Sequence, residues 1–187
     1  MTAEFKISLA PVTDATATGA AKDILESTQA QLGFVPNMYR TMANSSGYLS
    51  TYATGYKAFR QDSGFTAKEQ ETIFLVISRG NGCDYCTAAH SMIADKVSKL
   101  DSETLNALRS GAPLADARLQ ALAEFTAHVF ETRGMITRAR AAAFLEAGFA
   151  EKQIMEVVLA ISVKILSNYS NHIFHTDLDD VFAPYAV

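Results

Sequence analysis

Apolar residues recur three or four positions apart along most of the chain, the spacing that places them on one face of an α-helix. No hairpin signal joins two runs of alternating apolar and polar residues, so the pattern does not indicate a sheet. The sequence therefore predicts an all-α protein of about eight helices in one domain. Helices are expected at residues 14–32, 47–62, 66–79, 83–99, 102–109, 115–133, 138–147 and 151–175, with a shorter one at 36–44.

Residues with strong start and stop preferences mark several helix ends. Pro36 suits the first turn of the short helix, where its missing amide hydrogen is not needed. Thr66 and Glu69 have the form of a capping box, in which each side chain bonds the other residue's backbone amide. The run that follows, residues 70–79, is rich in β-branched residues and could be taken for a strand, but the cap and the length favour a helix. The glycine-rich segment 80–82 then ends this helix.

Composition and charge narrow the class of protein. The 187 residues are 49% apolar and 19% charged, an ordinary globular composition that allows a sizeable core. The net charge of −4 argues against nucleic-acid binding, which requires basic surfaces. The N-terminal sequence MTAEFKISLAPVTDATATG has no basic stretch before an apolar run, so no signal peptide is expected. Purely apolar runs reach only about five residues, too few to cross a membrane, and a cytoplasmic location is expected.

Both cysteines lie in the stretch GNGCDYCTAAH, at residues 80–90. In a reducing compartment, such a close pair is more typical of redox or metal chemistry than of a structural disulfide. Cys83, Cys86 and His90 share one face of a helix, because they lie three and four positions apart. Glu71 precedes the glycine turn, so it can join them only if its helix folds back antiparallel. These four residues form the candidate catalytic site.

The predicted position of the thiols favours their ionisation. The glycine turn places Cys83 and Cys86 in the first turn of a helix, where free amide hydrogens and the helix dipole stabilise a thiolate. His90 can accept the thiol proton, and Glu71 can orient or stabilise the imidazole, directly or through water. Such a pair can reduce a peroxide, because one thiolate becomes a sulfenic acid and the second thiol condenses with it. An external thiol then reopens the disulfide by exchange.

Other roles for the cysteine pair are open at the level of sequence. A structural zinc site needs four ligands, and the motif offers two cysteines and His90, with no pair of histidines at zinc-binding spacing elsewhere. Two buried cysteines can also be ordinary small core residues. A thioredoxin fold is not expected, because no βαβ pattern flanks the motif. The presence of Glu71 together with His90 favours redox chemistry without a bound metal.

The two halves of the chain share a residue spacing. The candidate site reads E-x11-C-x2-C-x3-H, and the second half repeats this as E-x11-N-x2-N-x3-H. Similar segments, GFTAKEQE and GFAEKQIME, lead into both sets. This predicts an internally duplicated helical pair whose second copy lacks the thiols, so chemistry is expected only in the first. The second set consists of Glu156, Asn168, Asn171 and His175.

Two further features have less specific interpretations. Aromatic residues at helical spacing within 47–62 are expected to pack in the core, or to line an apolar access channel or a subunit contact. The segment TDLDDVF, at residues 176–182, is expected to be a solvated acidic tail, with docking onto a neighbouring subunit as the alternative. The aromatic residues are Tyr48, Tyr52, Tyr56 and Phe59.

The motif and its flanks resemble a known family. E-x11-C-x2-C-x3-H on an all-α chain is similar to the alkylhydroperoxidase AhpD and carboxymuconolactone decarboxylase superfamily. The segment LGFVPNMYRTMANSSGYL, at residues 32–49, resembles the peroxidase-related branch with an alkylhydroperoxidase AhpD core. The ending NYSNHIFHTDLDDVF, at residues 168–182, is similar as well. The resemblance covers most of residues 30–182.

The resemblance implies one AhpD-like domain over residues 1–187 and a thiol-dependent peroxidase that reduces hydrogen peroxide or organic hydroperoxides in antioxidant defence. It also implies that Cys86 is the peroxidatic cysteine and Cys83 the resolving one, with a proton relay through His90 and Glu71. No cofactor beyond the thiols is implied. The implied partners are a peroxide, a thiol reductant or redox adaptor protein, and further copies of the chain in a trimer or hexamer, with no nucleic acid and no membrane.

One residue departs from the family pattern. AhpD has a histidine just before the second cysteine, where this chain has Tyr85. A phenol with a pKa of about 10 relays protons less readily near neutral pH than an imidazole does. The expected subdivisions of the domain are an N-terminal helical segment at about 1–62, thiol-motif helices at 64–99, a second helical repeat at 115–175 and a C-terminal tail at 176–187.

Two rival functions belong to other classes. Lactone decarboxylation, the other activity of the superfamily, does not need a thiol pair, so the two cysteines argue against it. A redox-sensing protein would instead use the disulfide to alter its oligomeric state, with little turnover. A double-serine variant separates the first rival from a peroxidase, and the mass of the oxidised and reduced assemblies separates the second.

Overall fold

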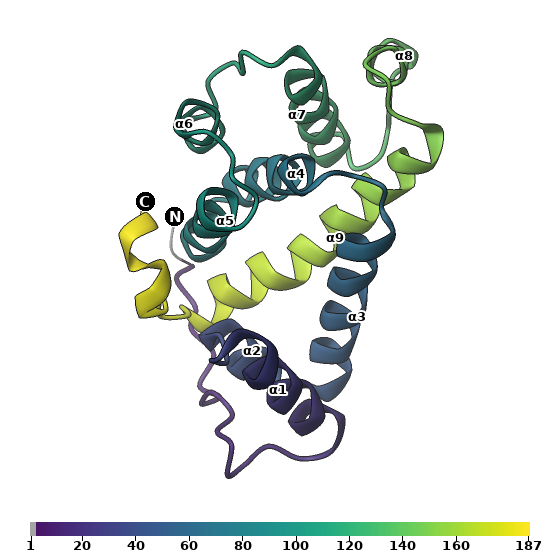
Figure 1. Cartoon of the computed structure of the whole chain (residues 1–187). Helices are drawn as coiled ribbons and strands as arrows, with labels where there is room; N and C mark the ends of the chain where they lie inside the picture. The colour runs from purple at the N-terminus through teal and green to yellow at the C-terminus, as the bar shows by residue number, and fades with distance from the viewer. Residues whose placement is uncertain (1–2) are drawn as a thin grey trace.

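The structure is a computed structural model that describes residues 3–187 (Figure 1). Over this range the chain forms nine α-helices and one short 3-10 helix, with no strand, so the all-α prediction is confirmed. The elements are α1 (Gly19–Leu32), α2 (Asn37–Met42), α3 (Ser46–Asp62), α4 (Ala67–Gly80), α5 (Asp84–Lys96), α6 (Ser102–Ser110), α7 (Ala117–Glu131), α8 (Arg138–Glu146), α9 (Glu151–Phe174) and η1 (Asp180–Tyr185).

Local side-chain signals set several helix ends. The Thr66 hydroxyl accepts a hydrogen bond from the Glu69 amide, and the Glu69 carboxylate accepts one from the Thr66 amide at 2.8 Å, so the expected capping box starts α4. Gly33 ends α1 in the left-handed conformation, with a φ of 81°. Pro36 is the residue just before α2 rather than part of its first turn. The cap at Thr66 matters most, because α4 carries one residue of the candidate site.

The first helix is shorter than expected, because α1 begins at Gly19 rather than near residue 14. The preceding segment is bound to α2 instead of continuing the helix. Asp14 forms an ion pair with Arg40 at 2.9 Å, and the amide of Val12 donates to the Arg40 carbonyl at 2.9 Å. These contacts lie far from Asp14 in sequence, so helical spacing alone does not reveal them.

The longest helix, α9, runs through the middle of the molecule (Figure 1). It packs against α2 and α3 on one side and against α4 and α5 on the other. α4 also packs on α5 and α7. One apolar cluster surrounds Phe59 and Phe74, and another contains Leu49, Cys83 and Cys86. The cysteine pair is therefore part of the interior where α4, α5 and α9 meet.

The C-terminal segment is not a solvated acidic tail. Phe182 is buried against the ring of Tyr85, and η1 packs along α5. Asp179 accepts hydrogen bonds from the Asn37 amide, at 3.1 Å, and from the Tyr85 hydroxyl. The expectation fails because the Asp179 carboxylate, which looks solvated in the sequence, has a partly buried donor on α2 and a buried donor on α5.

The predicted duplication of a helical pair is not confirmed. The first set of residues spans two helices, with Glu71 on α4 and the cysteine motif at α5 beyond a turn. The second set starts at Glu156 and continues through Asn168 on one uninterrupted helix, α9. The equal spacings therefore do not correspond to equal arrangements of helices.

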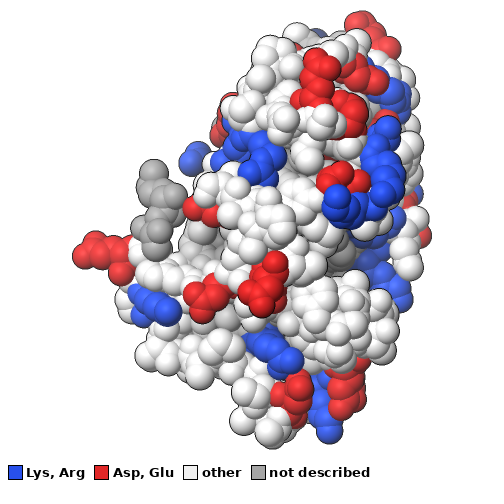
Figure 2. Space-filling view, turned by 60° about the vertical axis from the view of Figure 1, so that its left-hand side comes forward, with Lys and Arg blue, Asp and Glu red and all other residues white. Residues whose placement is uncertain are grey.

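Among residues 3–187, no helix combines the length and hydropathy that a membrane crossing requires. Figure 2 shows acidic and basic side chains interspersed over the face in view. Several basic side chains lie along the right-hand side of this view, with acidic ones beside them.

Candidate active site

The turn between α4 and α5 positions the thiols. Gly82 adopts a left-handed conformation with a φ of 64°, and the amide of Cys83 donates to the Ser78 carbonyl at 2.9 Å. Cys83 is the N-terminal cap of α5, and Cys86 lies in the first turn of that helix, as the sequence predicts. Both cysteines are free and buried. The unpaired amides of a helix start therefore lie beside both sulfur atoms.

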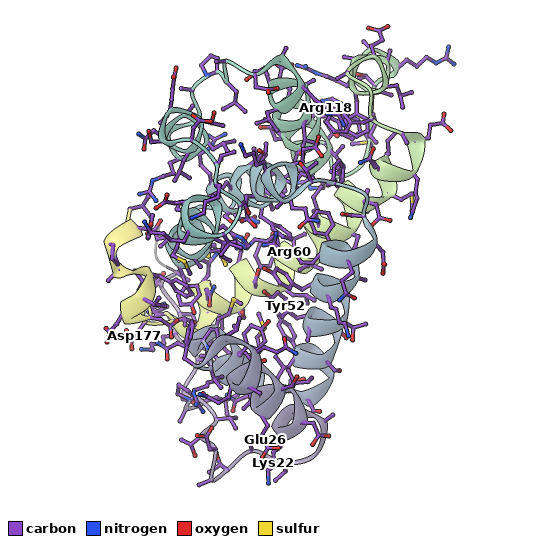
Figure 3. All side chains as sticks on the ribbon, viewed as in Figure 1. Lys22, Glu26, Tyr52, Arg60, Arg118 and Asp177 are labelled. Atoms are coloured by element: carbon purple, nitrogen blue, oxygen red, sulfur yellow. The ribbon has the colours of Figure 1, made fainter. Side chains whose placement is uncertain are left out.

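α4 folds back on α5 and brings Glu71 to His90. The His90 Nδ1 atom lies 2.8 Å from Glu71 Oε2, and both side chains are buried. Glu71 therefore contacts the imidazole directly. The other carboxylate oxygen lies 2.5 Å from the Arg60 guanidinium, an ion-pair distance without the angles of a hydrogen bond. In Figure 3, Arg60 lies between α3 and α9, in the interior of the molecule.

The environment keeps His90 neutral and Glu71 ionised. Burial lowers the pKa of His90 to about 4, and the nearby Lys164 ammonium acts in the same direction. Burial opposes ionisation of Glu71, but His90 and Arg60 hold its pKa below the ordinary value. At neutral pH the imidazole therefore donates its Nδ1 hydrogen to the carboxylate, which leaves Nε2 as the basic atom.

The two thiols differ in acidity. The hydrogen bond between them, together with burial, raises the pKa of Cys83. Burial also opposes ionisation of Cys86, but the bond from Cys83 and the Lys164 ammonium hold the pKa of Cys86 well below its ordinary value. The Asn171 amide nitrogen lies 3.3 Å from the Cys86 sulfur and 3.8 Å from that of Cys83. Both cysteines lie near the helix start and near the Asn171 amide. The bond from Cys83 lowers the pKa of Cys86 and raises that of Cys83, so Cys86 is the residue that becomes the thiolate.

A cavity of about 850 Å³ opens beside Cys86 and His90. Aromatic and aliphatic side chains from α1, α2, α3 and α5 form most of its wall, and Phe182 of η1 contributes as well. The aromatic residues at helical spacing on α3 have two roles. Phe59 packs in the core, whereas Tyr52 and Tyr56 line the cavity. We call four hydroxylated members of the wall the cavity tyrosines: Tyr39, Tyr52, Tyr56 and Tyr85.

Tyr85 is an anchor rather than a proton relay. Its hydroxyl donates to Asp179 and accepts from the Met38 amide at 3.4 Å. Burial and the Asp179 carboxylate raise its pKa. The residue that departs from the AhpD pattern therefore ties α5 to the C-terminal segment, and its phenol stays protonated.

Sequence reasoning missed three residues that the structure brings to the site. Arg60 of α3 pairs with Glu71, Asn171 of α9 contacts both sulfur atoms, and Lys164 of α9 lines the same cavity. Lys164 carries a signal in hindsight, because it is the lone charged residue in the apolar stretch VVLAISVKILS. The sequence indicates Asn171 only as a position of the second spacing set. Arg60 lies among other polar residues near the end of α3 and has no distinguishing local signal.

Residues of the second spacing set are divided between structural and site contacts. Asn168 accepts a hydrogen bond from Asn81, in the turn before α5, at 2.8 Å. Glu156 lies near Lys152 at 3.9 Å on α9, away from the cysteine contacts. His175 ends α9 in a left-handed conformation, with a φ of 49°. Within residues 3–187, no three His, Cys, Asp or Glu side chains converge as a metal site would require.

Comparison with known proteins gives a family match over part of the chain and a shared fold. Residues 48–128, which include the whole candidate site motif, match the model of the carboxymuconolactone decarboxylase family. No curated protein sequence matches the chain. An uncharacterized peroxidase-related protein with an alkylhydroperoxidase AhpD core from Ralstonia eutropha JMP134 is 22% identical, with 93% of each chain covered and a TM-score of 0.83.

Two more solved structures share the fold. An uncharacterized peroxidase-related protein from Silicibacter sp. TM1040 is 24% identical, with 93% of this chain and 90% of the other covered and a TM-score of 0.75. A variant of the debrominase Bmp8 in complex with 2,3,4-tribromopyrrole is 14% identical, with 96% of each chain covered and a TM-score of 0.77. The match over residues 48–128 and the AhpD-core fold of the described chain agree with the cysteine motif: this part of the chain resembles the carboxymuconolactone decarboxylase family, and the chain has the AhpD-like helical fold.

Proposed function

We propose that the protein is a thiol-dependent peroxidase that reduces hydroperoxides through a cycle between two thiols and a disulfide. One observation carries the proposal. Cys86 lies in the first turn of α5 with its pKa lowered, beside a neutral His90 bound to Glu71, on the wall of a large cavity. A thiolate and a base that share an accessible cavity are the elements that peroxide reduction requires.

The proposed reaction begins with attack of the Cys86 thiolate on one peroxide oxygen. The O–O bond breaks, Cys86 becomes a sulfenic acid, and the alkoxide leaves as an alcohol after it gains a proton. The Cys83 thiol then condenses with the sulfenic acid, which forms the disulfide and releases water. An external dithiol, or a redox adaptor protein that carries one, returns two electrons and is itself oxidised to a disulfide.

His90 carries the proton in this scheme. Its neutral Nε2 is free to accept the proton of the Cys86 thiol and to return it to the leaving alkoxide. Glu71 fixes the tautomer through the 2.8 Å contact with Nδ1, and Arg60 keeps the carboxylate ionised. Glu71 and Arg60 therefore act through the imidazole rather than on the peroxide.

The cavity favours organic hydroperoxides over hydrogen peroxide as the main substrates. A volume of about 850 Å³ is in the range of pockets for drug-sized ligands. The cavity tyrosines, with neighbours such as Phe34 and Met38, present an apolar and aromatic surface to the organic group. Antioxidant defence and assembly into a trimer or hexamer are part of the same proposal, and both draw on the family resemblance.

Reductive dehalogenation is a second candidate. The aromatic wall of the cavity favours it, and a debrominase shares the fold. The same thiol pair could supply the two electrons that replace a carbon–bromine bond with a carbon–hydrogen bond, with release of bromide and formation of the disulfide. Bromide release from a brominated pyrrole or phenol by the reduced protein supports this activity, and its absence removes it.

Free-thiol counting tests the peroxidase proposal. Protein reduced under anaerobic conditions receives one equivalent of cumene hydroperoxide, and the thiols are counted before and after. The proposal predicts that both thiols disappear and one equivalent of cumyl alcohol forms. The variant in which Cys83 and Cys86 are both serine is the control. Unchanged thiols in the wild type would overturn the proposal.

A further inference from the structure

Lys164 is a buried cation without a partner. Its side chain is 1% exposed, and its ammonium nitrogen has no hydrogen-bond partner among the described residues. Burying an ammonium group is costly unless a negative charge or several acceptors compensate it. The ring of Phe74, with its centre 5.6 Å from the nitrogen, supplies only a weak cation–π contact. The structure thus leaves a positive charge that some group in its vicinity must balance.

The face of α9 that carries Lys164 is directed at the thiols. Lys164, Asn168 and Asn171 lie four and seven positions apart, so they share one side of the helix. Asn171 contacts both sulfur atoms, and Asn168 bonds the turn that precedes α5. Lys164 itself lines the same cavity as Cys86 and His90. Its charged end therefore belongs to the site rather than to the general core.

Other charges of the site are already balanced. Glu71 is engaged by Arg60 at one oxygen and by His90 at the other, so no further carboxylate of the interior remains for Lys164. The cavity tyrosines stay protonated, because burial raises the pKa of each phenol. His90 is neutral, and the Cys83 thiol is the less acidic of the pair. Cys86 is the one group left that can become the anion.

We propose that Lys164 is the positioning residue that holds the Cys86 sulfur as a thiolate, as an ion pair across the packed faces of α5 and α9. This assignment rests on the proposed function only in that both use Cys86 as the nucleophile. The low pKa of Cys86 agrees with it, since Lys164 is among the causes. The two residues then have separate roles: Lys164 supplies the charge that holds the thiolate, and His90, which is neutral at rest, accepts and returns the proton.

Alkylation by iodoacetamide tests the pair without any peroxide. The reaction forms a carbon–sulfur bond and expels iodide, so its rate follows the thiolate fraction and needs no proton transfer to a leaving group. All variants carry Cys83→Ser, so that only Cys86 is labelled. The comparison includes Lys164→Met, Lys164→Arg and the control Lys57→Met, which removes a charge from an exposed lysine of the same cavity.

We expect Lys164→Met to slow alkylation at pH 7 by roughly tenfold or more, because each unit of increase in the thiol pKa removes about nine-tenths of the thiolate. The loss should disappear at high pH, Lys164→Arg should restore most of the rate, and Lys57→Met should have little effect. Superimposed profiles for Lys164→Met and the parent would overturn the proposal. A Lys164→Met protein that fails to fold would also count against it, because neutral Cys86 would leave no unpaired charge behind.

A failure of this test is distinct from a failure of the peroxidase proposal. If Lys164→Met slows alkylation but cumene hydroperoxide leaves the thiols intact, the ion pair is supported and the peroxidase activity is not. If peroxide oxidises the thiols but Lys164→Met leaves the alkylation rate unchanged, the peroxidase activity is supported and the ion pair is not.

Discussion

The neutral, buried state of His90 should lower the free energy of unfolding at acidic pH. The folded protein holds the pKa of this imidazole at about 4, because of burial and the Lys164 ammonium. In the unfolded chain the pKa returns to about 6.5. Between these two values the unfolded state binds a proton that the folded state does not bind, so acid favours unfolding. The stability due to neutral His90 is present above about pH 6.5 and is lost as the pH falls toward 4.

The size of the effect follows from the shift. A fall from about 6.5 to about 4 corresponds to about 3.5 kcal/mol at about 1.4 kcal/mol per unit, and about 2.5 kcal/mol of this is lost between pH 7 and pH 4.5. His90→Gln removes the titration and keeps an amide that can donate to Glu71. The stability of the variant should therefore fall about 2.5 kcal/mol less than that of the wild type over the same range.

Urea unfolding at several pH values between 7 and 4.5, at one protein concentration, measures this difference. Glu71, whose pKa is lowered in the folded state, adds acid sensitivity of the same sign to both proteins. His128→Gln is the control, because His128 lies on α7, where its ring accepts a hydrogen bond from the Thr137 amide at 3.3 Å. If wild type and His90→Gln lose stability in parallel, His90 is not held neutral, and its role as the base in the resting enzyme fails.

Three further predictions concern the relay, the anchor and the assembly. His90→Gln should slow peroxide reduction, measured by stopped-flow oxidation, by about a hundredfold and Glu71→Gln by about tenfold, whereas the alkylation rate of Cys86 should change little in both. The double variant should lose less activity than the product of the two single losses. A loss equal to that product would show that the two residues act independently. Tyr85→Phe should lower the free energy of unfolding by about 2 kcal/mol and preserve the alkylation rate, because Asp179 and the Met38 amide each lose a hydrogen-bond partner. A decrease of less than about 0.5 kcal/mol in urea unfolding would refute the role of Tyr85 as an anchor. Light scattering should give a multiple of the 20.2 kDa chain mass, and a monomer at micromolar concentration would contradict the assembly.

Local patterns were sufficient to predict the part of the site that lies near one turn. Helical spacing puts Cys83, Cys86 and His90 on one face, and the capping box and glycine turn define α4 and its end. The return of α4 that joins Glu71 to His90 was a condition for the site at the level of sequence, and the 2.8 Å contact between the two side chains meets it. These features depend on residues within about one helix length of each other.

Contacts between distant segments were not predictable from these patterns. Tyr85 and Asp179 are 94 positions apart, and the bond between them turns a polar C-terminal sequence into a docked one. Lys164 looks like an isolated charge in an apolar helix until α9 is packed against α5. The repeated spacing predicted a second helical pair, but spacing alone does not distinguish one continuous helix from two.

Sulfenic-acid labelling of single-serine variants tests the central claim most directly, namely that Cys86 is the thiolate that attacks the peroxide. Each variant, reduced and then treated with one equivalent of cumene hydroperoxide, is trapped with dimedone and mapped by mass spectrometry. The account predicts that Cys83→Ser acquires the label at Cys86, whereas Cys86→Ser acquires none. Label at Cys83 in Cys86→Ser, with none at Cys86 in Cys83→Ser, would reverse the roles of the two cysteines and contradict the account.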